Sequence, residues 1–164
     1  MAKIFTSLEQ LIGGTPLLEL HALLSESKLP GMKVLEFAFD HREPSDYLPH
    51  NYPRNCICYA GTHDNNTLRG WLDEICEEDL AYATAYLGLN EEEGPVWGVL
   101  RGGMSSVAEL FVAQLQDYLE LDSSARINTP GLPEGNWRWR MKPDALTPEL
   151  AEKIRAMTKR YGRI

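Results

Sequence analysis

Residues 56–72 read CICYAGTHDNNTLRGWL, and this stretch decides the fold class. Its first part, CICYA at 56–60, is a short apolar run typical of a buried strand. A small-residue turn follows, and Asn66 or Thr67 then caps a helix whose apolar residues recur at helical spacing, namely Leu68, Trp71, Leu72 and Ile75. A buried strand that leads directly into an amphipathic helix is the repeating unit of parallel α/β folds.

Similar units are predicted on both sides of this stretch. MKVLEFAF at 32–39 is a near-continuous apolar run with the length of a buried parallel strand. The loop at 40–55 is rich in Pro, Asp and Asn, and its length suggests a function. The other predicted elements are helices over about 78–87, 95–108 and 147–161, and an apolar run at 109–115 that is either a strand or the end of a helix.

The composition is that of an ordinary globular protein with 164 residues, 43% hydrophobic and 24% charged. A net charge of −8 argues against a nucleic-acid partner. No apolar run approaches the length that spans a membrane, and the N-terminus lacks the features of a secretion signal. Three cysteines, an odd number, fit a reducing cytoplasm better than a disulfide framework, so we expect a cytoplasmic protein without a membrane partner.

The turn after the strand at 56–60 places His63 and Asp64 side by side. In a (β/α)₈ barrel the chemistry lies at the C-terminal ends of the strands. His63 and Asp64 follow such an end, as does the loop at 40–55. We therefore expect a functional site there.

From His21 onward the chain closely resembles the C-terminal half of the catalytic barrel of the 4-α-glucanotransferases, also called amylomaltases (glycoside hydrolase family 77). The resemblance rests on four stretches in the family's order and spacing: LPGMKVLEFAF, LPHNYPRNCICYAGTHDNNTLRGW, SSVAELFVAQLQDYLEL and ARINTPGLPEGNWRWRM. It implies an α/β fold, the incomplete C-terminal portion of a (β/α)₈ TIM barrel over residues 21–164. It also implies transfer of an α-1,4-glucan segment to a glucan or glucose acceptor by a retaining mechanism.

The resemblance gives roles to individual residues. Asp64 would be the transition-state stabiliser that binds the sugar in the −1 position, with His63 beside it as a donor to the same sugar. Asn136 and His50 would be substrate contacts. From the residues alone, Asn136 could instead be a turn amide, and His50 a structural residue of its loop. The implied partners are maltooligosaccharides and other α-glucans, and we expect no cofactor and no metal.

Two catalytic motifs of the family are absent from the sequence. Retaining transfer needs two carboxyl groups about 5–5.5 Å apart, one as nucleophile and one as acid/base. The family carries them in an Arg-x-Asp-His and a Glu-Asp-Leu-Gly stretch, and neither occurs here. We therefore expect the chain to be inactive by itself. The alternative is a non-catalytic half-barrel that binds maltooligosaccharides or depends on a partner, with self-association through exposed barrel edges.

Residues 1–20 resemble a different family, the N-terminus of cysteine synthase, which is a pyridoxal-phosphate enzyme. The resemblance changes between Leu20 and His21, which suggests a fused or misassembled reading frame. A pyridoxal-phosphate enzyme is the third alternative, although the segment with that family's cofactor lysine is absent from the chain.

Two further groups of residues have competing interpretations. The four tryptophans are predicted to be core rather than sugar-stacking residues: Trp71, Trp97, Trp137 and Trp139. Cys56 and Cys58 invite a zinc interpretation with His50 and His63, but a strand-buried pair of free thiols is the prediction.

Overall fold

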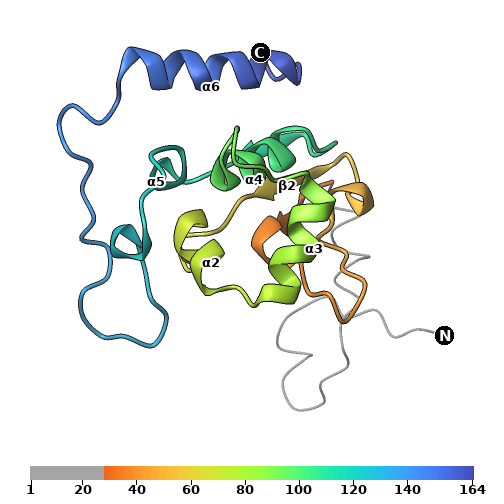
Figure 1. The fold of residues 1–164 in the computed structure, drawn as a ribbon, viewed down its shortest axis with the longest axis horizontal. Helices are drawn as coiled ribbons and strands as arrows, with labels where there is room; N and C mark the ends of the chain where they lie inside the picture. The colour runs from red at the N-terminus through yellow and green to blue at the C-terminus, as the bar shows by residue number, and fades with distance from the viewer. Residues whose placement is uncertain (1–27) are drawn as a thin grey trace. The chain divides into compact units, whose positions relative to one another are not determined.

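The computed structural model describes residues 28–164, so the segment predicted to resemble cysteine synthase, at 1–20, lies outside the described residues. Three strands form one parallel sheet in the order β1 (Gly31–Val34), β2 (Cys56–Tyr59) and β3 (Leu110–Val112) (Figure 1). In the register of this sheet Gly31 pairs with Cys56, and Ile57 pairs with Leu110. The predicted α/β class with a parallel sheet is confirmed.

The connection from β1 to β2 contains two 3-10 turns, and the connection from β2 to β3 contains three helices. The helices are α2 (Leu68–Glu74), α3 (Glu77–Leu87), α4 (Pro95–Met104), α5 (Leu115–Tyr118) and α6 (Pro148–Arg160). The 3-10 turns are η2 (Leu35–Phe37), η3 (Pro49–Asn51) and η4 (Ser123–Ala125). Thr67 caps α2 by accepting a hydrogen bond from the Gly70 amide at 3.1 Å, and Thr147 caps α6 in the same way.

Two predicted boundaries differ from the structure. The strand expected over 32–39 ends at Val34, and the chain then tightens into η2. The helix expected over 95–108 ends at Met104, which leaves the ambiguous run at 109–115 to supply β3. Apolar periodicity detects both segments but does not locate where a buried strand gives way to a turn.

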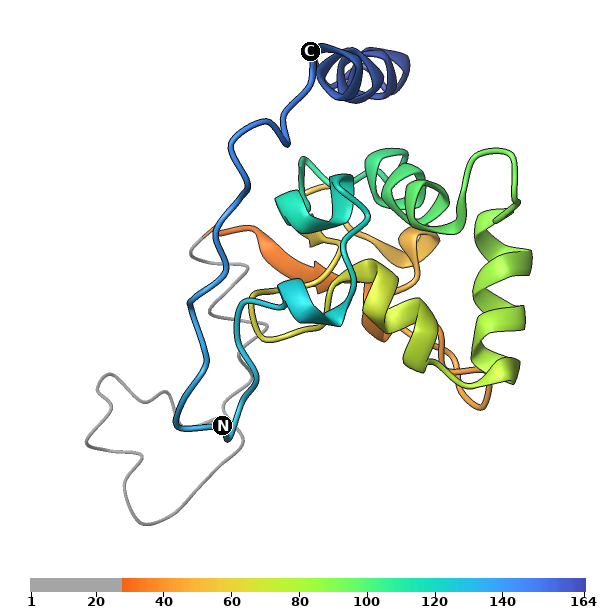
Figure 2. The same ribbon diagram turned by 60° about the vertical axis from the view of Figure 1, so that its left-hand side comes forward.

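The hydrophobic core lies between the sheet and its helices. Figure 2 shows α2, α3 and α4 on one side of β1. Trp97 of α4 is buried at the centre of this layer, and its indole Nε1 donates a hydrogen bond to Glu120 at 2.7 Å. Met32 of β1 and Leu110 of β3 are 58% and 51% exposed. The sheet therefore keeps apolar side chains that these helices do not cover.

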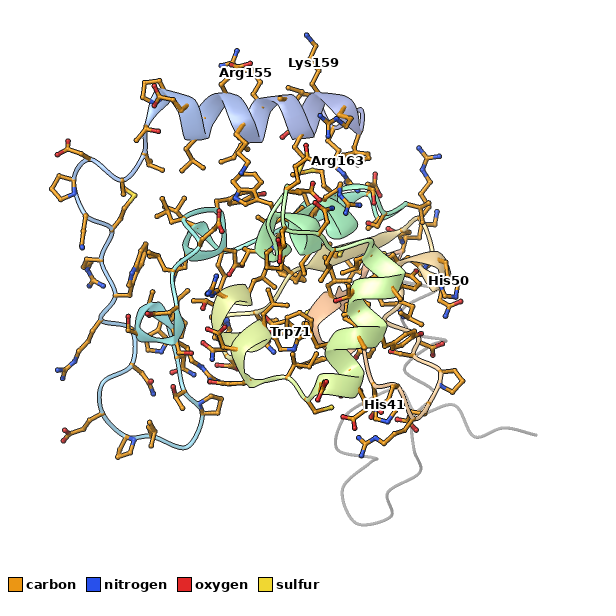
Figure 3. The ribbon with its side chains drawn as sticks, in the orientation of Figure 1. His41, His50, Trp71, Arg155, Lys159 and Arg163 are labelled. Carbon is orange, nitrogen blue, oxygen red and sulfur yellow. The ribbon has the colours of Figure 1, made fainter. Side chains whose placement is uncertain are left out.

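The last helix packs on the core through Leu150, Ile154 and Met157, and Arg163 after it adds hydrogen bonds. Arg163 donates hydrogen bonds to the carbonyls of Met104, Ser106 and Ala108 at 2.7, 2.9 and 3.0 Å. In Figure 3 Arg163 points toward the body of the fold, whereas Arg155 and Lys159 of α6 point away from it.

The tryptophan prediction holds in part, and the thiol prediction holds. Trp97 is core and Trp71 packs against the core, but Trp137 is 58% exposed because it lies on a loop that leaves the core. Cys56 and Cys58 are buried free thiols, and burial raises the pKa of Cys58 to about 11. No helix in residues 28–164 has the length and apolar character needed to cross a membrane.

Candidate functional site

The turn between β2 and α2 is held by its own side chains. The side-chain oxygen of Asn65, Oδ1, accepts hydrogen bonds from the Thr62 amide at 3.0 Å and from the Thr62 hydroxyl at 2.7 Å. This pair closes the turn around His63 and Asp64, which leaves their side chains 54% and 50% exposed. The sequence places them together, and the structure keeps them together: His63 Nε2 lies 3.3 Å from Asp64 Oδ1.

A groove opens beside this turn on the side of the sheet that α2 and α4 leave uncovered. It has a volume of about 460 Å³ and collects residues from the C-terminal parts of the strands. Its lining residues are Met32, Tyr59, Gly61, Thr62, His63, Asp64, Val112, Ala113 and Gln114. The groove therefore combines an apolar floor with a polar edge, as in many small-molecule sites.

Asp64 is oriented by residues that lie far away in the sequence. Asn128 donates a hydrogen bond from its amide to Asp64 Oδ1 at 2.6 Å. Arg126 donates to the Asp64 carbonyl at 2.7 Å and to the Asn128 carbonyl at 2.9 Å. No local pattern identifies Asn128 or Arg126 as partners of Asp64, because more than sixty residues separate them along the chain.

An aromatic ring covers His63. The centroids of the His63 and Trp137 rings lie 5.1 Å apart at a tilt of 39°. Trp137 is anchored by its backbone, whose amide donates to the Ile127 carbonyl at 2.7 Å. The indole is thus an exposed aromatic surface next to Asp64, which is the arrangement that a sugar face can stack on.

Asn136 lies in the same loop but uses its amide within it. Its oxygen accepts from the Thr129 amide at 2.8 Å, and its nitrogen donates to the carbonyls of Thr129 and Leu132 at 3.2 and 3.0 Å. The structure therefore places Asn136 as the side chain that closes the loop leading to Trp137.

His50 lies on η3 and contacts α3. Its Nδ1 atom is 2.8 Å from the Tyr86 hydroxyl, and its ring packs on the Tyr86 ring. Figure 3 shows His50 and His41 beside opposite ends of α3. The structure thus brings His63 and Asp64 together in the groove and seats His50 against Tyr86.

Two buried carboxyl groups lie near the site, and no motif in the sequence predicts either of them. Glu36 follows β1 and is buried, and burial raises its pKa to about 8. Asp117 lies in α5 after β3, and burial raises its pKa to about 6 although the amides of Leu68 and Gln114 donate hydrogen bonds to it at 2.8 and 3.2 Å. Each therefore follows a strand end of the sheet, as Asp64 does.

One cluster of potential metal ligands occurs in residues 28–164. His41, Cys76 and Asp79 bring one ligand atom each within 4.8 Å of one another. Asp79 Oδ1 already accepts hydrogen bonds from the His41 backbone at 2.8 Å and pairs with the His41 ring at 2.6 Å, which fastens the loop after β1 to α3. Cys56 and Cys58 do not form such a cluster with the described histidines.

The groove has the chemistry of charge stabilisation and sugar contact. Asp64 is the only acid among its lining residues in the described part of the chain. One carboxylate can steady positive charge on a sugar ring, but the retaining reaction needs a separate nucleophile and acid/base.

Comparison with known proteins places the chain in one family. The profile of the 4-alpha-glucanotransferases, glycoside hydrolase family 77, matches residues 13–147. A 4-alpha-glucanotransferase of Clostridium butyricum is 49% identical over 135 residues, which is 82% of this chain and 28% of that protein. One from Thermus thermophilus is 40% identical over 178 aligned positions, 99% of this chain and 36% of that protein.

A solved structure agrees with these relatives. The amylomaltase from Streptococcus agalactiae in complex with acarbose superposes with a TM-score of 0.84 at 34% identity. The superposition covers 92% of this chain and 30% of that one. The chain thus spans about a third of the length of the relatives it matches. Because the family profile covers most of its residues, the chain belongs to the 4-alpha-glucanotransferase family.

Proposed function

We propose that residues 31–164 are part of a (β/α)₈ barrel and supply the sugar-stabilising side of a site for α-1,4-glucan transfer. The observation that carries this proposal is the groove at the strand ends, with Asp64 as its only acid and His63 and Trp137 beside it. The similar structure is described as bound to acarbose, which supports an α-glucan as the ligand.

In this proposal Asp64 accepts hydrogen bonds from hydroxyl groups of the sugar at which the bond is exchanged. These bonds strengthen as positive charge develops on the ring, so they stabilise the transition state more than the bound substrate. Asn128 fixes one carboxylate oxygen at 2.6 Å, which leaves the other free to meet the sugar. His63 donates to the same sugar, and Trp137 supplies an aromatic face for it.

The bonds themselves are exchanged by groups that this groove does not contain. A retaining transfer needs a nucleophile and an acid/base, and the motifs that hold them in the family are absent from the sequence. We therefore propose that the chain by itself does not catalyse transfer. Asn136 and His50 remain predicted substrate contacts, with Asn136 acting through the Trp137 loop that it closes, and a cytoplasmic location remains a prediction.

The second candidate function is a half-barrel that binds maltooligosaccharides without catalysis or is completed by a partner. The exposed apolar side chains of Met32 and Leu110 favour it, because a closed barrel would bury them. Sedimentation velocity tests whether a second copy of the chain completes the half-barrel. Self-association that Met32→Lys abolishes would support this, and a chain that stays monomeric at all concentrations would contradict it.

Calorimetric titration of the chain with acarbose tests the main proposal. We expect saturable binding that Asp64→Ala weakens about tenfold or more, because a hydrogen bond to a charged group contributes about 1.5–3 kcal/mol. Asp144→Ala, at an exposed position outside the groove, is the matched control. No binding at millimolar acarbose, or equal binding by the Asp64 variant, would refute the proposal.

A further inference from the structure

A buried carboxyl group lies under the turn that carries His63 and Asp64, and the proposed reaction does not use it. Glu36 is 8% exposed, and its Oε1 atom has no hydrogen-bond partner in the described part of the chain. A Cβ placed on Gly61 would lie 2.5 Å from this oxygen and 3.0 Å from Cδ of Glu36. The carboxyl group is thus packed directly against the backbone at the start of the turn.

Asn65 connects Glu36 to the other side of the turn. The Glu36 carboxyl accepts a hydrogen bond from the Asn65 side chain, and this bond lowers the pKa of Glu36 against the larger effect of burial. The side-chain Oδ1 atom of Asn65 accepts hydrogen bonds from the backbone amide and the hydroxyl group of Thr62, at 3.0 and 2.7 Å. A chain of contacts therefore runs from the end of β1 through Asn65 to the residue immediately before His63.

The charges around Glu36 come from three other segments. Asp117 of α5 and Glu74 of α2 oppose a negative charge on Glu36, and Arg126 after η4 favours one. Burial outweighs these groups and raises the pKa of Glu36 to about 8. The carboxyl group therefore holds its proton at neutral pH, and a charge would appear beneath the turn only in alkaline solution.

We propose that Glu36 is a positioning residue: its neutral carboxyl group supports the Gly61–Asn65 turn and so sets the direction of His63 and Asp64. The inference rests on the proposed function for its biological meaning, because the site that it serves is the Asp64 groove. Ionisation of Glu36 places an unpaired charge in a buried space beside Asp117. The turn then moves to let water reach that charge, and the groove loses its geometry.

Nuclear magnetic resonance on the isotope-labelled chain tests the support directly. Between pH 6 and 9.5 we expect the backbone signals of Gly61–Asn65 to shift with a midpoint near the Glu36 pKa of about 8. Glu36→Gln keeps the shape of the side chain and an acceptor oxygen for Asn65, but it cannot ionise. The pH-dependent shift of the turn signals should therefore vanish in this variant. Glu92→Gln, an exposed matched change, should keep it. Turn signals that do not titrate in the unmodified chain overturn the inference, and so does an unchanged transition in Glu36→Gln.

Acarbose binding supplies the functional readout. If acarbose binds only to the chain with a neutral Glu36, its dissociation constant should rise about tenfold at one pH unit above the pKa of Glu36. In Glu36→Gln the dissociation constant should not change with pH. Binding that does not depend on pH in the unmodified chain refutes the positioning role while leaving the proposed function intact. Absent binding with a titrating turn refutes the proposed function alone. Should Glu36→Gln fail to fold, the titration of the unmodified chain still decides.

Discussion

At the scale of the residue, the two buried carboxyl groups show why burial alone does not fix what an acid contributes. Glu36 and Asp117 follow neighbouring strand ends, and burial raises the pKa of both. Asp117 accepts hydrogen bonds from two backbone amides, one at the start of α2 and one just before α5. Glu36 leaves one oxygen without a partner. A neutral replacement should therefore stabilise the protein more at Glu36 than at Asp117.

Glu36→Gln should stabilise the protein, and the gain should increase with pH. The pKa of Glu36 rises from 4.5 to about 8 on folding, so the folded chain retains a proton that the unfolded chain has released. The free energy of unfolding therefore falls as pH rises through this range, by at most about 3 kcal/mol at pH 7. Urea unfolding at pH 5 and pH 7.5 measures the gain, with Glu92→Gln as control. If Glu36→Gln gained the same stability at both pH values, the raised pKa of Glu36 would be contradicted.

Asp117→Asn should stabilise the protein less at pH 7 than Glu36→Gln does. Removing the charge relieves the cost of the burial that raises the pKa of Asp117 to about 6, but the loss of a hydrogen bond offsets this gain. The carboxylate accepts hydrogen bonds from the Leu68 and Gln114 amides on separate oxygens, and an asparagine can offer only one oxygen. One buried donor is then left facing an NH₂ group, at a cost of about 1–3 kcal/mol. Urea unfolding at pH 7 compares this variant with Glu36→Gln, with the exposed Asp144→Asn as control. An equal gain in stability from Asp117→Asn and Glu36→Gln would show that these amides find other acceptors.

At the scale of the element, the sequence was most informative where chemistry is local. The cap at Thr147 follows from residue type and spacing and is confirmed, and of the two caps predicted for α2, Asn66 or Thr67, the structure has Thr67. The boundaries of β1 and α4 could not be predicted from periodicity, because packing against other elements decides them. Gly103 is one such packing point, since α4 meets the ring of Phe111 there.

Gly103→Ala should destabilise α4 against β3. Alanine gains about 1 kcal/mol of helix propensity over glycine, but the new methyl group would overlap the Phe111 ring, with Cδ2 and Cζ at 2.8 Å. Overpacking of this kind costs about 1–3 kcal/mol, so a net loss is expected. Thermal unfolding compares it with Gly31→Ala, where a methyl group meets nothing within 4 Å. A Gly103 variant as stable as the Gly31 variant would mean that the ring moves freely.

At the scale of the whole molecule, the sequence identified the family and the pair His63–Asp64 but not the surroundings of that pair. The family profile, the parallel sheet and the turn after β2 agree with the sequence-based expectations. Arg126, Asn128 and Trp137 reach the turn from a loop far along the chain, and only the folded structure reveals such contacts. The prediction that Trp137 belongs to the core is wrong, because the residue type alone does not distinguish a packed indole from an exposed one.

The most direct test of the central claim is to map acarbose on the isotope-labelled chain by nuclear magnetic resonance. The account predicts that the largest signal changes occur at His63, Asp64 and the indole of Trp137, with smaller changes at the predicted contact His50 beside α3. Changes centred on His50 and Tyr86, with the groove unaffected, would contradict the claim that Asp64 and its neighbours hold the sugar.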